Sequence, residues 1–109
     1  MFYLYRGLDP RQAFNALVYN PSTHSNAVPK AALRTEELSV WTDLSAVSTQ
    51  CPGWKVAAFR VDEARRAGYI LMRDPSDPTH ILLYDKNNPD RRPSPSTAQR
   101  LANAAVILP

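Results

Sequence analysis

Cysteine, glycine and long apolar runs are all scarce in this chain of 109 residues. A single cysteine excludes an internal disulfide framework and is typical of a protein in a reducing compartment. No apolar run approaches the roughly 18 residues that a membrane-spanning helix needs. Residues 1–8 do not have the basic start and apolar segment of a signal peptide. We therefore expect a cytoplasmic protein with no membrane-spanning segment.

Few residues are suited to metal or phosphate chemistry. The three glycines are too far apart to form a glycine-rich phosphate loop: Gly7, Gly53 and Gly68. The two histidines and the cysteine do not have the spacing of metal ligands, so no metal site is expected. Cys51 has no activating neighbour in the sequence, and its expected role is that of a small structural hydrophobe.

The rest of the composition is typical of one folded domain. Hydrophobic residues make up 44% of the chain and charged residues 21%, which predicts a single domain over residues 1–109. The net charge of +3 arises wholly in residues 53–109, because acidic and basic residues balance in residues 1–52. This excess favours a phosphate-bearing partner, although it is also common on ordinary protein surfaces.

Residues 53–85 are the stretch around which the fold is expected to be organised. Three nearly continuous apolar runs, at residues 56–61, 69–72 and 81–84, predict strands that are covered on both faces. Asp62 is expected to cap a short helix that ends at Gly68. The predicted core side chains in this stretch are Phe59, Val61, Ile70, Leu71, Ile81 and Leu83.

Turn and capping residues predict the elements on either side. Residues 2–6 form an expected strand that Gly7 ends, and Asp9 followed by Pro10 predicts a helix to about Leu17. Residues 19–36 are rich in turn residues and are expected to be irregular, as either a functional loop or a poorly ordered excursion. Within them, residues 31–33 are compatible with one helical turn.

Strand and capping signals also predict the elements from residue 38 to the end of the chain. Residues 38–41 are expected to be a strand, and Thr42 to cap a helix with Leu44 and Val47 facing inward. Ser94 and Pro95 predict the start of the last helix, and residues 106–108 are either a final strand or a frayed helix end. The predicted fold class is α+β, with a mixed, mainly antiparallel sheet of about five strands and three or four short helices.

Three polar residues are candidates for chemistry on their positions alone. Arg6 closes an aromatic strand, where its guanidinium either binds a phosphate or carboxylate bidentately or reaches water with its stem over neighbouring tyrosines. His80 heads a predicted strand and is either an acid–base group in a cleft or a histidine hydrogen-bonded to the preceding turn. His24 lies in the long loop, where a lone histidine is usually solvated.

Three segments together resemble ADP-ribosyltransferase-like proteins. Residues 4–7, Leu-Tyr-Arg-Gly, resemble the first strand of that family, where an arginine contacts the phosphates of NAD. Residues 38–44 resemble its second block, a strand with a serine beside the nicotinamide pocket followed by a helix. Residues 54–61 and 69–70 resemble the strands that come next. The resemblance implies that Arg6 binds phosphate groups and that Ser39 flanks the pocket.

The resemblance extends to further residues by their order in the chain. Related RNA 2′-phosphotransferases use a histidine and a second arginine, which His24 and Arg34 match in order. The glutamate-type enzymes also have a late catalytic glutamate, whereas residues 64–109 contain none and His80 stands where such a polar residue is needed. The implied ligand is NAD or an RNA phosphate, with Arg6, His24 and Arg34 as binding residues and Ser39 and His80 as catalytic residues.

Two functions of different classes follow from these observations. The small size, the missing glutamate and the proline-rich loops favour an interaction module of a bacterial toxin–antitoxin or phage-defence system. Such a module uses no cofactor and binds a protein or nucleic acid. The alternative is an ADP-ribosyltransferase-like enzyme, or a relic of one, in which Arg6, Ser39 and His80 share one cleft. The sequence does not predict an oligomeric state.

Overall fold

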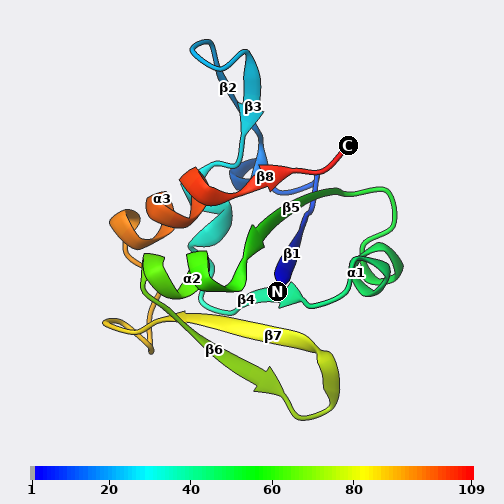
Figure 1. Cartoon of the computed structure of the whole chain (residues 1–109), viewed down its shortest axis with the longest axis vertical. Coiled ribbons are helices and arrows are strands. Elements are labelled where there is room, and N and C mark those ends of the chain that lie inside the picture. The colour runs from blue at the N-terminus through cyan, green and yellow to red at the C-terminus, as the bar shows by residue number, and fades with distance from the viewer. Residues whose placement is uncertain (1) are drawn as a thin grey trace.

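The main sheet has six strands, and every registered pair in it is antiparallel (Figure 1). A computed structural model describes residues 2–109. The strands, in their order across the sheet, are β6 (Tyr69–Asp74), β7 (Asp77–Asp85), β4 (Leu38–Trp41), β1 (Tyr3–Leu8), β5 (Lys55–Arg60) and β8 (Val106–Ile107). The predicted α+β class with a mainly antiparallel sheet is confirmed, with one strand more than expected.

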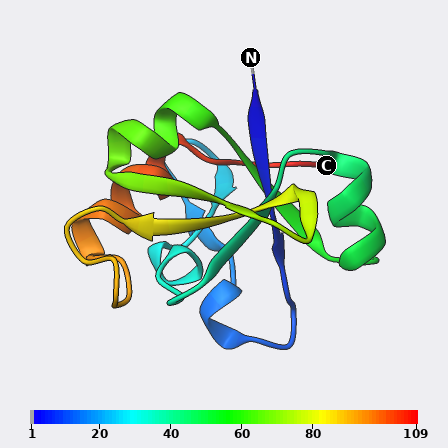
Figure 2. The same cartoon turned by 90° about the horizontal axis from the view of Figure 1, so that it is seen from below.

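Helices lie on both sides of this sheet, in unequal numbers. Helices α2 (Val61–Ala67) and α3 (Pro95–Ala104) contribute to the main core together with the 3-10 turn η2 (Lys30–Leu33). Helix α1 (Leu44–Gln50) lies on the opposite side from α2 and α3 (Figure 2). None of the helices in residues 2–109 is long and apolar enough to cross a membrane.

Strand register divides the sheet into a core face and an open face. Residues paired across neighbouring strands share a face, and alternate residues along a strand do so too. Helices α2 and α3 cover the core face. Its buried strand residues are Leu4, Leu8, Leu38, Val40, Ala57, Phe59, Tyr69, Ile81, Leu83 and Asp85. The other face carries Tyr3, Tyr5, Ser39, Trp41, Ile70, Met72, His80, Leu82, Tyr84 and Val106.

The core prediction is right for most of its residues and wrong for Ile70. Phe59, Ile81 and Leu83 are buried, and Val61 and Leu71 pack partly buried against the core. Ile70 is 41% exposed because it lies on the open face of edge strand β6. The expectation that all three central strands are covered on both faces therefore fails at this edge.

Two of the three helix ends predicted between residues 60 and 100, at Gly68 and at Ser94, are confirmed. Gly68 adopts φ +113° at the C-terminus of α2, a conformation that a residue with a Cβ rarely adopts. Ser94 Oγ accepts a hydrogen bond from the Thr97 amide at the start of α3. The cap predicted at Asp62 is wrong, because α2 begins at Val61 with Arg60 at the N-cap position, and Asp62 lies within its first turn.

The N-terminal third departs most from the sequence prediction. The helix expected over residues 10–17 is wrong, because only the 3-10 turn η1 (Ala13–Asn15) forms. The Asp9 carboxylate accepts hydrogen bonds from the amide and the side chain of Arg11, and the Asp9 carbonyl accepts one from Asn15. These local bonds compete with the intrahelical pattern. Strand β1 also continues through Gly7 to Leu8, because Gly7 pairs with Val56 on β5.

Residues 19–36 are more regular than their composition predicts. Strands β2 (Val18–Asn20) and β3 (Ser25–Ala27) form a two-stranded hairpin that projects from the domain (Figure 1). The helical turn expected near residues 31–33 is present as η2. In the following segment Val47 is buried as predicted, but Leu44 is 43% exposed and does not face inward. The final strand that was one alternative for residues 106–108 is confirmed as β8.

Candidate functional site

Strands β1 and β4 separate near the centre of the sheet. Strand β1 pairs with β5 along its whole length, from Tyr3 to Leu8, but its register with β4 consists of Tyr5 opposite Trp41 alone. Strand β4 itself stays paired with β7 along its whole length. From Arg6 onward, β1 is therefore not joined to β4 by a regular ladder of backbone hydrogen bonds. Arg6 is the first residue of β1 after the two strands separate.

Arg6 bridges the separated strands through its side chain. Its Nη1 donates a hydrogen bond to the backbone oxygen of Ser39 at 3.0 Å, whereas its buried Nε has no partner in the described part of the chain. Burial lowers the pKa of Arg6 from its ordinary value. No carboxylate within residues 2–109 forms an ion pair with it. A largely desolvated cation without an anion is unfavourable, so an anion bound at this position would stabilise the protein.

Gly7, which follows Arg6, packs closely against Cys51 and Trp54 in the segment after α1. A Cβ built on Gly7 lies 2.8 Å from Cys51 Sγ and 3.1 Å from Trp54 Cε3, so only glycine fits here without a shift. Cys51 is buried, and burial raises the pKa of its thiol although the nearby charge of Arg6 opposes this. A thiol in this state is a poor nucleophile, which agrees with the structural role expected for Cys51.

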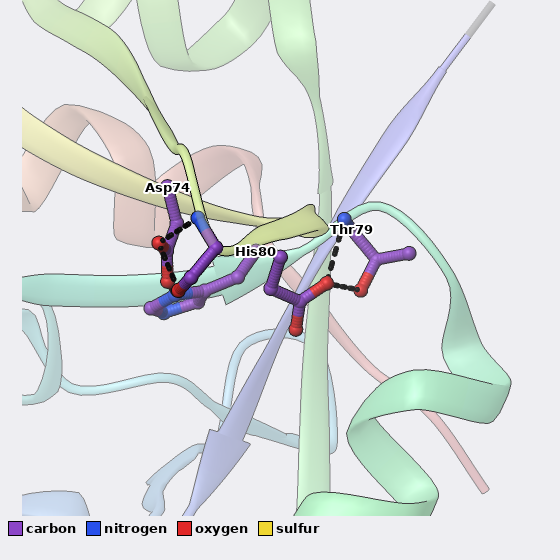
Figure 3. Close-up of polar contacts among 5 residues, drawn as sticks. Asp74, Thr79 and His80 are labelled. Carbon is purple, nitrogen blue, oxygen red and sulfur yellow. Dashed lines mark hydrogen bonds and ion pairs between the residues drawn. The ribbon is translucent and has the colours of Figure 1, made fainter.

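His80 forms the second polar centre, beside the turn that joins β6 and β7. Its Nδ1 lies 2.8 Å from Asp74 Oδ2, and the two side chains face each other in Figure 3. The His80 ring lies 5.0 Å from the Trp41 ring, centroid to centroid, on the neighbouring strand. The opposite ring nitrogen, Nε2, is buried and has no hydrogen-bond partner among residues 2–109. A carboxylate on Nδ1 orients the ring as it does in a general base, but Nε2 must first become accessible before it can accept a proton from a substrate.

The Asp74 carboxylate is held in its ionised form by its neighbours. The hydrogen bond with His80 is the largest cause, and hydrogen bonds from the Ser76 hydroxyl and amide add to it. Together they lower the pKa of Asp74 to about 2. Thr79 makes a parallel set of bonds to Asp77, drawn beside it in Figure 3. Both carboxylates are thus tied to the turn itself.

Asp74 is the site residue that sequence reasoning missed. The register of β6 with β7 shifts after Arg73, which pairs with Ile81, whereas Asp74 pairs with Asp77. Pro78, which has no amide hydrogen, lies within the extra residues of β7. This irregularity brings His80 beside Asp74, and its only sequence signal is a proline two residues before the histidine. The alternative in which His80 is hydrogen-bonded to the preceding turn agrees with this geometry.

The predicted site residues fall into separate groups. Arg6 contacts the backbone of Ser39, and Ser39 lies on the same face as His80 two residues from the Trp41–His80 pair. The side chain of Arg6, however, leaves β1 on the core face, whereas those of Ser39 and His80 leave on the open face. The strands are adjacent as a shared cleft requires, but the three side chains do not start from one face.

The other two predicted binding residues lie elsewhere. His24 is exposed in the turn between β2 and β3, with φ +53°. Arg34 follows η2 and donates its Nε to the backbone oxygen of Pro93 at 2.9 Å. Neither side chain has a hydrogen bond with Arg6 or His80. Within the described part of the chain, no group of histidine, cysteine, aspartate or glutamate residues is arranged to hold a metal ion.

Comparison of the chain with protein-family models, with curated proteins and with solved structures gave no match. The geometry of these residues is therefore the basis for a functional proposal.

Proposed function

We propose that the chain binds a phosphate-bearing nucleotide ligand at Arg6, in the manner implied by its resemblance to ADP-ribosyltransferase-like proteins. The observation that carries this proposal is the partly buried Arg6, which has no carboxylate partner, a neutral acceptor on Nη1 and no acceptor on Nε. A phosphate oxygen supplies the missing acceptor and the missing negative charge at once. Arginine suits this role because its planar fork matches two phosphate oxygens.

The residues around Arg6 fit a binding site better than they fit the full glutamate-type enzyme. Ser39, on the neighbouring strand, is held beside Arg6 by the hydrogen bond to its backbone. Residues 64–109 contain no glutamate, and the Asp74 carboxylate is already engaged by His80 and Ser76. If the chain is an enzyme, proton transfer therefore falls to His80 Nε2, with Asp74 orienting the ring. If it is a relic, ligand binding at Arg6 persists without this chemistry.

Titration calorimetry with NAD and with a short RNA tests the proposal. Arg6→Ala is expected to weaken binding about ten- to a hundredfold, from the loss of a charge-assisted contact of roughly 1.5–3 kcal/mol. Arg6→Lys retains the charge without the fork and should recover part of the affinity. Arg65→Ala is the matched control, because Arg65 is an exposed arginine on α2. Thermal melting of each variant verifies that it is folded.

Two outcomes contradict the proposal. One is the absence of measurable binding of both ligands by the unmodified chain at millimolar concentration. The other is binding that survives Arg6→Ala and Arg6→Lys unchanged, which would remove Arg6 from the site.

A second candidate function, the interaction module, is favoured by the open face of the sheet. This face carries apolar side chains that are roughly half exposed: Tyr3 (48%), Ile70 (41%), Met72 (51%) and Val106 (54%). Ile70 and Met72 lie together on edge strand β6, whereas Tyr3 and Val106 lie toward the opposite edge at β8. An exposed apolar edge marks an interaction site when a partner covers it, so the candidate surface is the one at Ile70 and Met72. Arg60 pairs with Tyr3 across β1 and β5 and therefore lies on the same face. Its positive charge is paired with Asp62. A protein partner therefore suits this face better than a nucleic acid, whose binding depends on cationic groups.

Paired substitutions separate this second function from the first. Ile70→Glu combined with Met72→Glu should abolish association with a protein partner of a toxin–antitoxin or phage-defence kind while leaving nucleotide binding intact. Val18→Glu, at a 55% exposed residue on the hairpin, is the control. The measurement is quantitative mass spectrometry of proteins retained by each variant, followed by reconstitution with the purified candidate. If the unmodified chain, the double variant and the control retain the same proteins, the open face is not the binding surface.

A further inference from the structure

We propose that a small pocket between η2 and the segment before α3 is an oxyanion site for the phosphate group of a phosphomonoester. Its volume is about 150 Å³, about five times the share of liquid volume of one water molecule. The lining residues are Phe14, Ala31, Arg34, Thr35 and Arg92. Arg6, Ser39 and His80 are not among them, so this site is separate from the nucleotide site proposed above.

Two arginines line this pocket without an acidic residue beside them. Neither Arg34 nor Arg92 forms an ion pair within residues 2–109, and the neighbouring Glu36 and Glu37 are exposed and do not line the pocket. Two like charges around one small volume repel each other. An anion between them adds two attractions that outweigh this repulsion, and the guanidinium fork is suited to phosphate oxygens.

The arginine on the inner side of the pocket is held in place. Arg34 donates Nε to the Pro93 backbone oxygen at 2.9 Å. The residue after Pro93 is fixed in turn, because the buried Asp85 carboxylate accepts the Ser94 amide at 2.9 Å and the Asn87 amide at 3.0 Å. Anchoring of Nε restricts where the remaining N–H groups of Arg34 can point. A preorganised donor loses less freedom when it binds a ligand.

Thr35, which lines the pocket, carries a buried hydroxyl group. Its Oγ1 has no hydrogen-bond partner among residues 2–109, and a buried hydroxyl without a partner is costly. Turned toward a bound phosphate, it donates one hydrogen bond. Phe14, which is 41% exposed, contributes an aromatic flank to the same pocket. Aromatic and arginine groups around one volume fit a phosphate that is attached to a larger organic group.

Inorganic phosphate is the probe for this site. The ¹⁵N-labelled full chain is titrated with phosphate, and sodium chloride keeps the ionic strength constant. We expect amide shifts at Arg34, Thr35 and Arg92, with a dissociation constant of about 1–10 mM for a single phosphate group. Arg92→Ala should weaken binding about tenfold, and since Arg92 is exposed the fold should not change. Arg91→Ala, the exposed neighbouring arginine, is the matched control and should have no effect.

The design keeps this site distinct from the one at Arg6. Arg6→Ala should leave the phosphate titration unaltered even if it abolishes nucleotide binding. Adenosine 5′-monophosphate, compared with phosphate, should add shifts near Phe14 if the phosphate belongs to a larger ligand. Absence of saturable shifts at Arg34 and Thr35, or an equal loss in Arg91→Ala and Arg92→Ala, overturns the proposal.

Discussion

Gly7→Ala is the substitution that most directly tests the packing beside Arg6. The added Cβ meets Cys51 Sγ at 2.8 Å, Cys51 Cβ at 3.1 Å and Trp54 Cε3 at 3.1 Å. Overpacking of this kind costs about 1–3 kcal/mol. Replacing a strand glycine by alanine recovers roughly 0.5–1 kcal/mol of backbone entropy. The expected net loss in the free energy of unfolding is therefore about 1–2 kcal/mol, measured by urea denaturation.

A double-mutant cycle identifies the contact that is responsible. Cys51→Ala removes Sγ and with it the shortest contact, so Gly7→Ala should cost less in that background by at least about 0.5 kcal/mol. Gly53→Ala is the comparison, because its Cβ meets nothing within 4 Å and its cost comes from φ +79° alone. Cys51→Ala should not relieve that cost. If Gly7→Ala costs the same in both backgrounds, the Cys51 contact is not the origin of the effect.

Three further predictions concern the core, the His80 centre and the last helix. Phe59→Ala should lower the free energy of unfolding by about 3–5 kcal/mol, whereas Ile70→Ala, at an exposed position, should cost much less; equal costs in thermal melts would contradict the division into two faces. Because the pKa of Asp74 is lowered to about 2, its stabilising contribution should be present above the ordinary value of 3.8 and disappear as the pH falls toward 2. Carboxyl NMR should show the pKa of Asp74 rising in His80→Ala, and an unchanged pKa would exclude His80 as the main cause. Ser94→Ala should cost about 0.5–2 kcal/mol by removing the cap of α3, and a urea midpoint that does not move would show that the cap is dispensable.

The sequence prediction was most accurate for elements that depend on interactions between residues close together in the chain. Strands β5, β6 and β7 and the cap at Ser94 follow from local periodicity and capping, and these were predicted well. The helix expected from Asp9 failed because side-chain bonds to Arg11 compete with it, which a list of caps does not show. The hairpin of residues 18–27 was missed because its strands have only three residues each.

The candidate site depends on long-range pairing that the sequence does not encode locally. That β1 lies between β4 and β5 brings Arg6 to Ser39, which is 33 positions away in the chain. The Asp74–His80 pair depends on a register shift near Pro78. Sequence patterns could name Arg6 and His80 as candidates, but could not show that Arg6 and His80 leave the sheet on different faces.

The central place of β1 has a consequence for how the chain is synthesised. Strand β1 is made before either of its neighbours, and its full-length partner β5 follows only after residue 54. During translation at about 5–20 residues per second, the edge of β1 that pairs with β5 therefore stays unpaired for several seconds. Its aromatic residues are available for mispairing in that interval, since an unpaired strand edge readily accepts another chain. Slow synthesis before residue 60 should thus increase aggregation more than slow synthesis after it.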